Sequence, residues 1–136
     1  MTDRLSHEAR SRNMSRIRSV DTEPERVVRR MLFGLGYRFR LHRRDLPGTP
    51  DIVFVSKRKA IFVHGCFWHG HARCARATPP SSNVRFWAEK IAKNKSRDQA
   101  AVSALKHIGW RVCVIWQCEL RRSGVVQGKL RRFLLN

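Results

Sequence analysis

The chain has 136 residues, the size of a single domain, and 42% of them are hydrophobic, which excludes a disordered chain. Lysine and arginine number 29 against 10 aspartates and glutamates, so the formal net charge is +19. A surface this basic repels itself unless a polyanion neutralises it, which points to a nucleic acid, although a generally basic proteome would give the same composition. The polar N-terminus and the lack of an apolar run of about 18 residues exclude a signal peptide and a membrane span, so we expect a bacterial cytoplasmic protein.

The first 20 residues predict an arginine-rich arm that contacts DNA, and residues 21–136 predict one further domain. The arm has few apolar residues, and Met14 and Ile17 are two of them, at helical spacing. So little apolar surface cannot anchor a helix by itself, which predicts that the arm becomes ordered only on a partner.

A helix is expected to begin near Asp21 and to end at Gly36. Thr22 and Glu25 fit a capping box, and glycine is the usual residue just after a helix. The elements after it alternate in type: strands at 37–42, 52–55 and 60–63, a helix at 83–107, a strand at 110–116 and a helix at 121–135. A tight turn at 56–59 makes the second and third strands a hairpin. This order predicts an α/β fold with a mixed β-sheet flanked by helices, in which 110–116 is a central strand.

The densest group of metal-ligating side chains lies in residues 63–74, which hold three histidines and two cysteines. Cys66, His71 and Cys74 lie close together, and Cys118, just past the last strand, could complete the tetrahedral set of a structural zinc site. The spacing leaves open whether His69 replaces His71 as the ligand. The remaining cysteine, at 113, is expected inside the core.

A single carboxylate, Asp51, opens a buried strand directly after Pro50. An aspartate at this place beside a hairpin is typical of metal-dependent nucleases, because Mg²⁺ prefers carboxylate oxygen, although a turn-capping aspartate has the same pattern. His64 ends the next strand and should lie near Asp51. Either His64 or His69 could deprotonate an attacking water. Glu25 caps its helix and reaches a metal only if that helix start faces the end of the sheet.

Two pairs of adjacent aromatic residues complete the candidate site. Phe67 and Trp68 lie between metal ligands, and we expect them to be exposed, because a rigid loop rarely buries two adjacent large rings. Exposed apolar side chains of this kind can enter a base step of DNA. For Phe86 and Trp87, which open the long helix, core packing and a DNA contact are equally open.

Four blocks of sequence occur in a fixed order: Leu46-Pro47-Gly48-Thr49-Pro50-Asp51, His64-Gly65-Cys66-Phe67-Trp68-His69, Phe86-Trp87-Ala88-Glu89-Lys90-Ile91 with Asn94, and Gly109-Trp110-Arg111-Val112. Over residues 8–122 the chain resembles the very-short-patch repair (Vsr) DNA mismatch endonucleases. The resemblance implies a variant of the PD-(D/E)xK restriction-endonuclease-like fold with a structural zinc site. It also implies Mg²⁺-dependent nicking of duplex DNA 5′ to the thymine of a T:G mismatch, which arises when 5-methylcytosine deaminates.

The resemblance also implies roles for individual residues of the catalytic centre. Asp51 would bind Mg²⁺ together with the backbone carbonyl of Val63. His69 would be the general base, and His64 and Glu25 would assist at the shell of metal-bound water. Two residues one helical turn apart would hold metal-bound waters: Asn94 and Asp98.

The same resemblance implies the zinc ligands and the contacts with DNA. The structural zinc would be bound by Cys66, His71, Cys74 and Cys118. The side chains that wedge into the duplex beside the mismatch would be Phe67, Trp68 and Trp87, and those that reach the minor groove would be Met14 and Ile17. The expected partner is double-stranded DNA with a T:G mismatch, bound by a monomer in the nucleoid. The alternatives are a restriction-type endonuclease that cuts matched sites and a non-catalytic, zinc-stabilised DNA-binding protein.

Overall fold

The computed structural model describes residues 21–78 and 81–135, so the expected arm with Met14 and Ile17 lies outside the described residues. The described chain forms a four-stranded sheet in the order β1-β2-β3-β4. The strands are β1 (Arg40–Leu41), β2 (Ile52–Phe54), β3 (Lys59–His64) and β4 (Arg111–Trp116). The first three pair antiparallel, and β4 runs parallel to β3, which confirms the mixed sheet.

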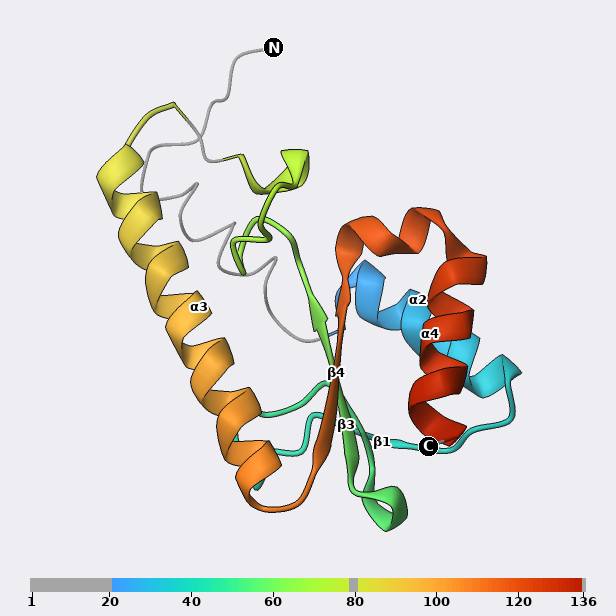
Figure 1. Ribbon diagram of the computed structural model, residues 1–136. Coiled ribbons are helices and arrows are strands. Elements are labelled where there is room, and N and C mark those ends of the chain that lie inside the picture. The colour runs from blue at the N-terminus through green and yellow to red at the C-terminus, as the bar shows by residue number, and fades with distance from the viewer. Residues whose placement is uncertain (1–20, 79–80, 136) are drawn as a thin grey trace.

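Three helices cover the two faces of this sheet: α2 (Glu23–Gly34), α3 (Val84–His107) and α4 (Ser123–Leu135). Helix α3 packs on one face, and α2 and α4 pack together on the other (Figure 1). Helix α3 connects the parallel strands β3 and β4, because parallel neighbours need a long crossover. None of the helices in the described ranges is long and apolar enough to cross a lipid bilayer.

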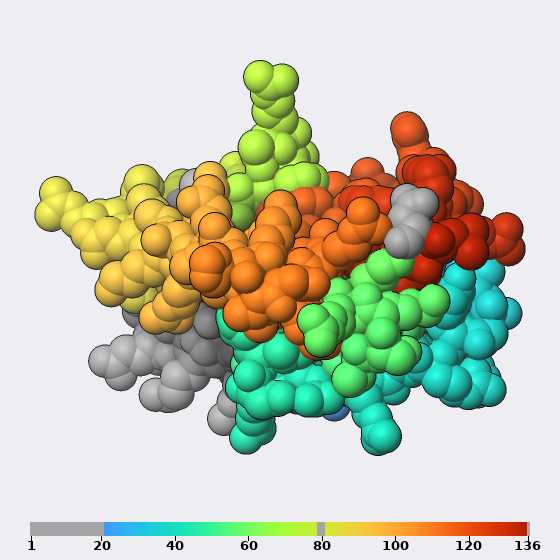
Figure 2. Space-filling view, turned by 60° about the horizontal axis from the view of Figure 1, so that its bottom comes forward, coloured from blue at the N-terminus to red at the C-terminus, as the bar shows by residue number. Residues whose placement is uncertain are grey.

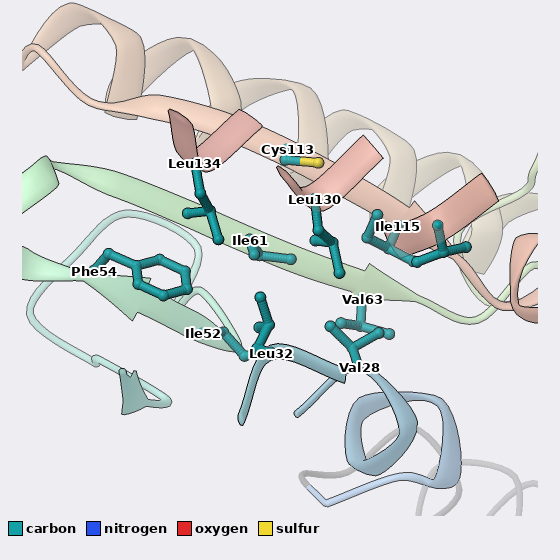
Figure 3. Close-up of a cluster of buried hydrophobic side chains, with 11 residues drawn as sticks. Val28, Leu32, Ile52, Phe54, Ile61, Val63, Cys113, Ile115, Leu130 and Leu134 are labelled. Carbon is teal, nitrogen blue, oxygen red and sulfur yellow. The ribbon is translucent and has the colours of Figure 1, made fainter. Parts of the chain in front are cut away.

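The alternation of side chains along β3 divides the core into two parts. Ile61 and Val63 face α2 and α4, where they pack against Leu32 and Leu130 (Figure 3). Ala60 and Phe62 belong to the smaller cluster under α3. Burying an aliphatic side chain of this size contributes about 1.5–3 kcal/mol, so both faces of β3 hold it firmly in place.

The first strand and the first hairpin turn differ from the sequence prediction. Only Arg40 and Leu41 of residues 37–42 pair as a strand, and before them the rings of Tyr37 and Phe39 pack edge-on against Phe54. Lys59, expected in the turn, begins β3 and is buried. Its Nζ donates hydrogen bonds to the carbonyls of residues 133 and 134 at the end of α4, at 2.7 and 3.1 Å.

The prediction that 110–116 is a central strand is wrong, because β4 pairs only with β3 in the described sheet and forms its edge. Side chains close the outer side of β4. Lys129 Nζ donates to the carbonyl of Val114 at 2.9 Å, and Glu119 accepts from the backbone N–H of Trp116 at 2.8 Å. Lys129 and Glu119 also form an ion pair at 3.1 Å.

The topology brings several chain segments to one end of the sheet. Strands β3 and β4 both end there, β2 begins there, and the start of α2 lies close by (Figure 1). The segment after β3, coloured yellow-green in Figure 2, partly projects from the surface beside α3. Every predicted site residue within the described ranges lies in or beside these segments.

Candidate active site and metal centre

Asp51 lies at this end of the sheet, just before β2. The antiparallel register pairs Ile52 with Ile61 and so sets Asp51 opposite Phe62, next to Val63. The backbone N–H of Val63 donates to Asp51 Oδ2 at 2.7 Å. Burial and the neighbouring Glu25 carboxylate raise the pKa of Asp51 to about 7, against the hydrogen bond from Val63, which favours the charged form.

This environment fits a divalent cation. Asp51 and Glu25 place two carboxylates in one buried region, where their mutual repulsion is relieved by a positive ion. The carbonyl of Val63 points to the same side of its strand as its N–H, toward Asp51. Carboxylate and carbonyl oxygens are the ligands that Mg²⁺ prefers.

The start of α2 does face the end of the sheet, which was the condition for a role of Glu25 near the metal. Thr22 and Glu25 line the same cleft as Asp51. Thr22 Oγ1 accepts the backbone N–H of Glu25 at 3.4 Å, as a capping box requires. The Glu25 side chain accepts from the N–H of Asp21, one residue before the cap, and is 4% exposed.

Two imidazole rings that line the same cleft stack on each other. The rings of His64 and His69 lie 3.8 Å apart with an angle of 4° between their planes. Asp98, from α3, lies 2.6 Å from His69 Nδ1 and 3.9 Å from His64 Nε2. A carboxylate on Nδ1 holds the imidazole with Nε2 available to accept a proton, as a general base requires.

His64 is buried and has a different environment. Burial, together with the nearby His69, lowers the pKa of His64 to about 4. Its Nδ1 has no hydrogen-bond partner within the described part of the chain. His64 is therefore a neutral ring at physiological pH, and His69 is the imidazole of the pair that is oriented by a charge.

Asn94 and Asp98 make protein contacts that the sequence did not reveal. Asn94, buried on α3, donates from Nδ2 to the backbone carbonyl of Trp68 at 2.9 Å and so fixes the segment after β3. Asp98 is bonded to His69. Both residues still line the cleft, so their binding of metal-bound water stays a prediction.

One cleft of about 490 Å³ collects these groups from five separate stretches of chain. Arg97 contributes a positive charge to its wall. The lining residues that were also selected from the sequence are Glu25, Asp51, Val63, His64, Phe67, Trp68, His69, Asn94 and Asp98. A carboxylate pair that suits a metal ion, together with an oriented imidazole, can activate a water molecule for attack on a phosphodiester.

A second group of ligand atoms comes from the segment after β3 and from the residues just after β4. One ligand atom each from Cys66, His71, Cys74 and Cys118 lies within 4.8 Å of the others. Cys118 Sγ is 3.4 Å from His71 Nδ1, whereas His69 bonds Asp98, so the structure places His71 among the cysteines. Four soft protein ligands at this spacing fit a closed, tetrahedral zinc site. The cysteine at 113 lies in the core, as expected.

The aromatic side chains differ in part from their expected exposure. Trp68 is only 6% exposed and Trp87 2%, and their ring centroids lie 5.9 Å apart. Phe67 packs on both rings but stays half-buried. Phe86 is 44% exposed. The long helix supplies a packing partner that the loop lacks, which is why Trp68 is buried.

Sequence reasoning missed two residues that contact Glu25. Arg29 Nη2 and His42 Nε2 each lie 2.9 Å from Glu25 Oε2. Arg29 follows Glu25 by one helical turn, a spacing that favours such an ion pair. For His42 the only signal was the strand register, because Leu41 pairs with Ile52 and therefore sets His42 opposite Asp51.

The mixed sheet flanked by helices is a restriction-endonuclease-like fold, and the cleft at its end gathers groups suited to hydrolysis. The catalytic domain of the homing endonuclease I-Bth0305I has a similar fold, with a TM-score of 0.59 and 23% identity over 85% of this chain and 96% of that domain. The model of the family "DNA mismatch endonuclease Vsr" matches residues 2–76. The chain belongs to the Vsr family and is a DNA endonuclease, a hydrolase that cleaves DNA.

Three relatives with similar sequences are named as nicking enzymes or as an endonuclease. The Type II nicking enzyme V.XorIIP of Xanthomonas oryzae pv. oryzae is 54% identical over 98% of both chains. The Type II nicking enzyme V.NmeAIP of Neisseria meningitidis is 41% identical over 98% of this chain and 95% of its own. The DNA mismatch endonuclease Vsr of Escherichia coli is 43% identical over 89% of this chain and 77% of its own.

Proposed function

We propose that this endonuclease nicks one strand of duplex DNA 5′ to the thymine of a T:G mismatch, with catalytic Mg²⁺ and structural zinc. One observation carries the proposal: the carboxylates of Asp51 and Glu25 and the pair formed by His69 and Asp98 meet in one cleft. The name of the Escherichia coli relative supports the mismatch, and the names of the others support the cutting of one strand.

The residues divide the reaction among themselves. Asp51, the carbonyl of Val63 and Glu25 would hold Mg²⁺, which when bound polarises the scissile phosphate and stabilises its developing charge. His69 takes a proton from the attacking water through Nε2, while Asp98 orients the ring and stabilises its charged form. Neutral His64, stacked on His69, keeps that ring plane fixed.

Recognition of the mismatch is assigned to the aromatic cluster at the mouth of the cleft. Phe67, half-buried and so the most accessible of the three rings, is the tip of a wedge, and Trp68 and Trp87 pack against it. Inserting a ring between base pairs costs unstacking energy, and this cost is lowest where pairing is already disturbed. Arginines, which outnumber lysines in the chain, supply phosphate contacts without sequence preference.

The names of two relatives, "Type II nicking enzyme", mention no mismatch, and this favours a second candidate, a restriction-type nicking enzyme that acts at matched sites. Two duplexes that differ only in T:G against T:A, each labelled on either strand, distinguish the candidates. We expect cleavage of the thymine strand of the T:G duplex alone, only with Mg²⁺, and none by Asp51→Asn. Equal cleavage of both duplexes would assign a matched site, and no cleavage of either would contradict the T:G substrate.

The magnesium-free arm of this assay is best prepared by omitting Mg²⁺, because a chelator would also remove zinc. A T:G mismatch is asymmetric, so one protein molecule suffices for one cut. We therefore infer a monomer on DNA, and sedimentation of the protein with a short T:G duplex tests it. A complex with two copies per duplex would contradict this inference.

A further inference from the structure

The Glu25 carboxylate is fixed by contacts from outside the cleft. Three donors converge on its Oε2 atom: Arg29 Nη2 at 2.9 Å, His42 Nε2 at 2.9 Å and the backbone N–H of Asp21 at 3.2 Å. Neither Arg29 nor His42 is among the described residues that line the cleft. With Oε2 held by three bonds, the rotamer of Glu25 is set, and the carboxylate keeps its position beside Asp51.

His42 makes a second contact that Arg29 does not make. Its backbone N–H donates to the carbonyl of Asp51 at 3.1 Å, one step beyond the last paired residue of β1. The side chain of His42 thus holds Glu25, while its backbone N–H holds Asp51. The φ of His42 is +48°, a left-handed conformation that costs a non-glycine residue about 1–2 kcal/mol and persists only where surrounding contacts impose it.

A metal ion bound by Asp21, Glu25 and His42 would be another interpretation, since their ligand atoms lie within 4.8 Å of one another. Arg29 argues against it. Its guanidinium forms ion pairs with both Asp21 and Glu25, so a positive charge already occupies the position of such an ion. Because Arg29 neutralises the Oε2 atom of Glu25, a cation in the cleft interacts mainly with the other carboxylate oxygen, Oε1.

We propose that His42 is a positioning residue for the endonuclease reaction, which sets Glu25 against Asp51 so that the two carboxylates receive the catalytic cation. This inference rests on the proposed Mg²⁺ dependence. It assigns His42 no contact with DNA or with the reacting atoms. Removal of His42 should therefore weaken the response to Mg²⁺ and slow cleavage while the affinity for DNA is kept.

The test compares His42→Ala and His42→Gln with His107→Ala, a control at an exposed histidine at the end of α3. Four quantities are measured on the zinc-loaded full chain: the single-turnover nicking rate, the Mg²⁺ concentration for half-maximal rate, the affinity for the T:G duplex without Mg²⁺, and the rise in Tm on adding Mg²⁺. We expect His42→Ala to slow nicking about 10–100-fold and to require more Mg²⁺, as for other residues that orient metal ligands.

We expect His42→Ala to show a smaller Mg²⁺-induced rise in Tm at unchanged DNA affinity. The amide of His42→Gln can donate to Glu25, so it should recover most of the rate, and His107→Ala should match the wild type. The proposal is overturned if His42→Ala keeps the wild-type rate and Mg²⁺ requirement. It is also overturned if both variants lose rate, DNA affinity and Mg²⁺-free Tm together, because that result shows a purely structural role.

The Tm measurement needs no substrate, which separates the two proposals. If Mg²⁺ raises the Tm of the wild type but not of His42→Ala, the positioning role stands even when the T:G duplex is not cut, and only the proposed substrate fails. If the T:G duplex is cut by wild type and His42→Ala alike, only the positioning role fails.

Discussion

The buried Asp51 carboxylate predicts that the site lowers the stability of the protein. Raising its pKa from 3.8 to about 7 destabilises the ionised, metal-free fold by about 4 kcal/mol, since each pH unit corresponds to about 1.4 kcal/mol. Asp51→Asn removes the charge, and its side-chain oxygen can still accept the bond from Val63. The variant should therefore be inactive and, without Mg²⁺, more stable than the wild type by up to about 4 kcal/mol.

The sign of the pH dependence follows from the direction of the shift. Because the folded pKa lies above the unfolded one, the favourable contribution of protonated Asp51 is fully present below pH 4 and is lost as the pH rises to about 7. The stability difference between Asp51→Asn and wild type should widen over this range and then stay constant. Urea unfolding at pH 5 and pH 8, in Mg²⁺-free buffer without chelator, measures it.

Asp45→Asn is the matched control, because Asp45 is exposed and pairs with Arg43 on the surface. Exposed pairs contribute little, so this variant should stay close to the wild type at both pH values. An Asp51→Asn protein that is no more stable than the wild type at pH 8 would refute the reasoning. A difference of the same size at pH 5 and pH 8 would refute it too.

Four further substitutions test the rest of the site. Asp98→Asn should slow single-turnover nicking at least about tenfold at unchanged DNA affinity, because His69 loses its charged partner; an unchanged rate would contradict this role. Cys118→Ser should lower the Tm and the zinc content measured by mass spectrometry, and active wild-type protein without zinc would contradict the site. Phe67→Ala should reduce the preference for T:G over T:A duplexes, whereas Trp68→Ala should cost about 3–5 kcal/mol in urea unfolding, since Trp68 is buried. A Trp68→Ala protein of wild-type stability, or a Phe67→Ala protein of full selectivity, would count against the assigned roles.

The type and order of the elements could be predicted because each has a local signal. Gly36, at φ +92°, directly follows the last capping residue of α2, as its position in the sequence indicated. The apolar run in β4 predicted a strand but not its place in the sheet. An edge strand that is covered by helices can have the same apolar pattern as a central strand. The sequence therefore contains no sign that β4 lies at the edge of the sheet.

The sequence identified residues that gather in the cleft, but not the contacts between them. Asp51 and His64 were expected to be neighbours because a hairpin fixes its own register. The bond between His69 and Asp98 joins residues 29 positions apart, and it depends on how α3 packs across the sheet. Local sequence contains no information on that packing, so Asp98 was identified with a metal-water role while its contact with His69 was not.

The outer edge of β4 has a consequence for assembly. Its central carbonyl and the amide two residues later are already satisfied by Lys129 and Glu119, so a strand from another molecule finds no free hydrogen-bonding partners at those positions. A continuous intermolecular sheet through this edge would first have to break both contacts. Losing both side chains at once would expose these backbone groups, at a place remote from the cleft.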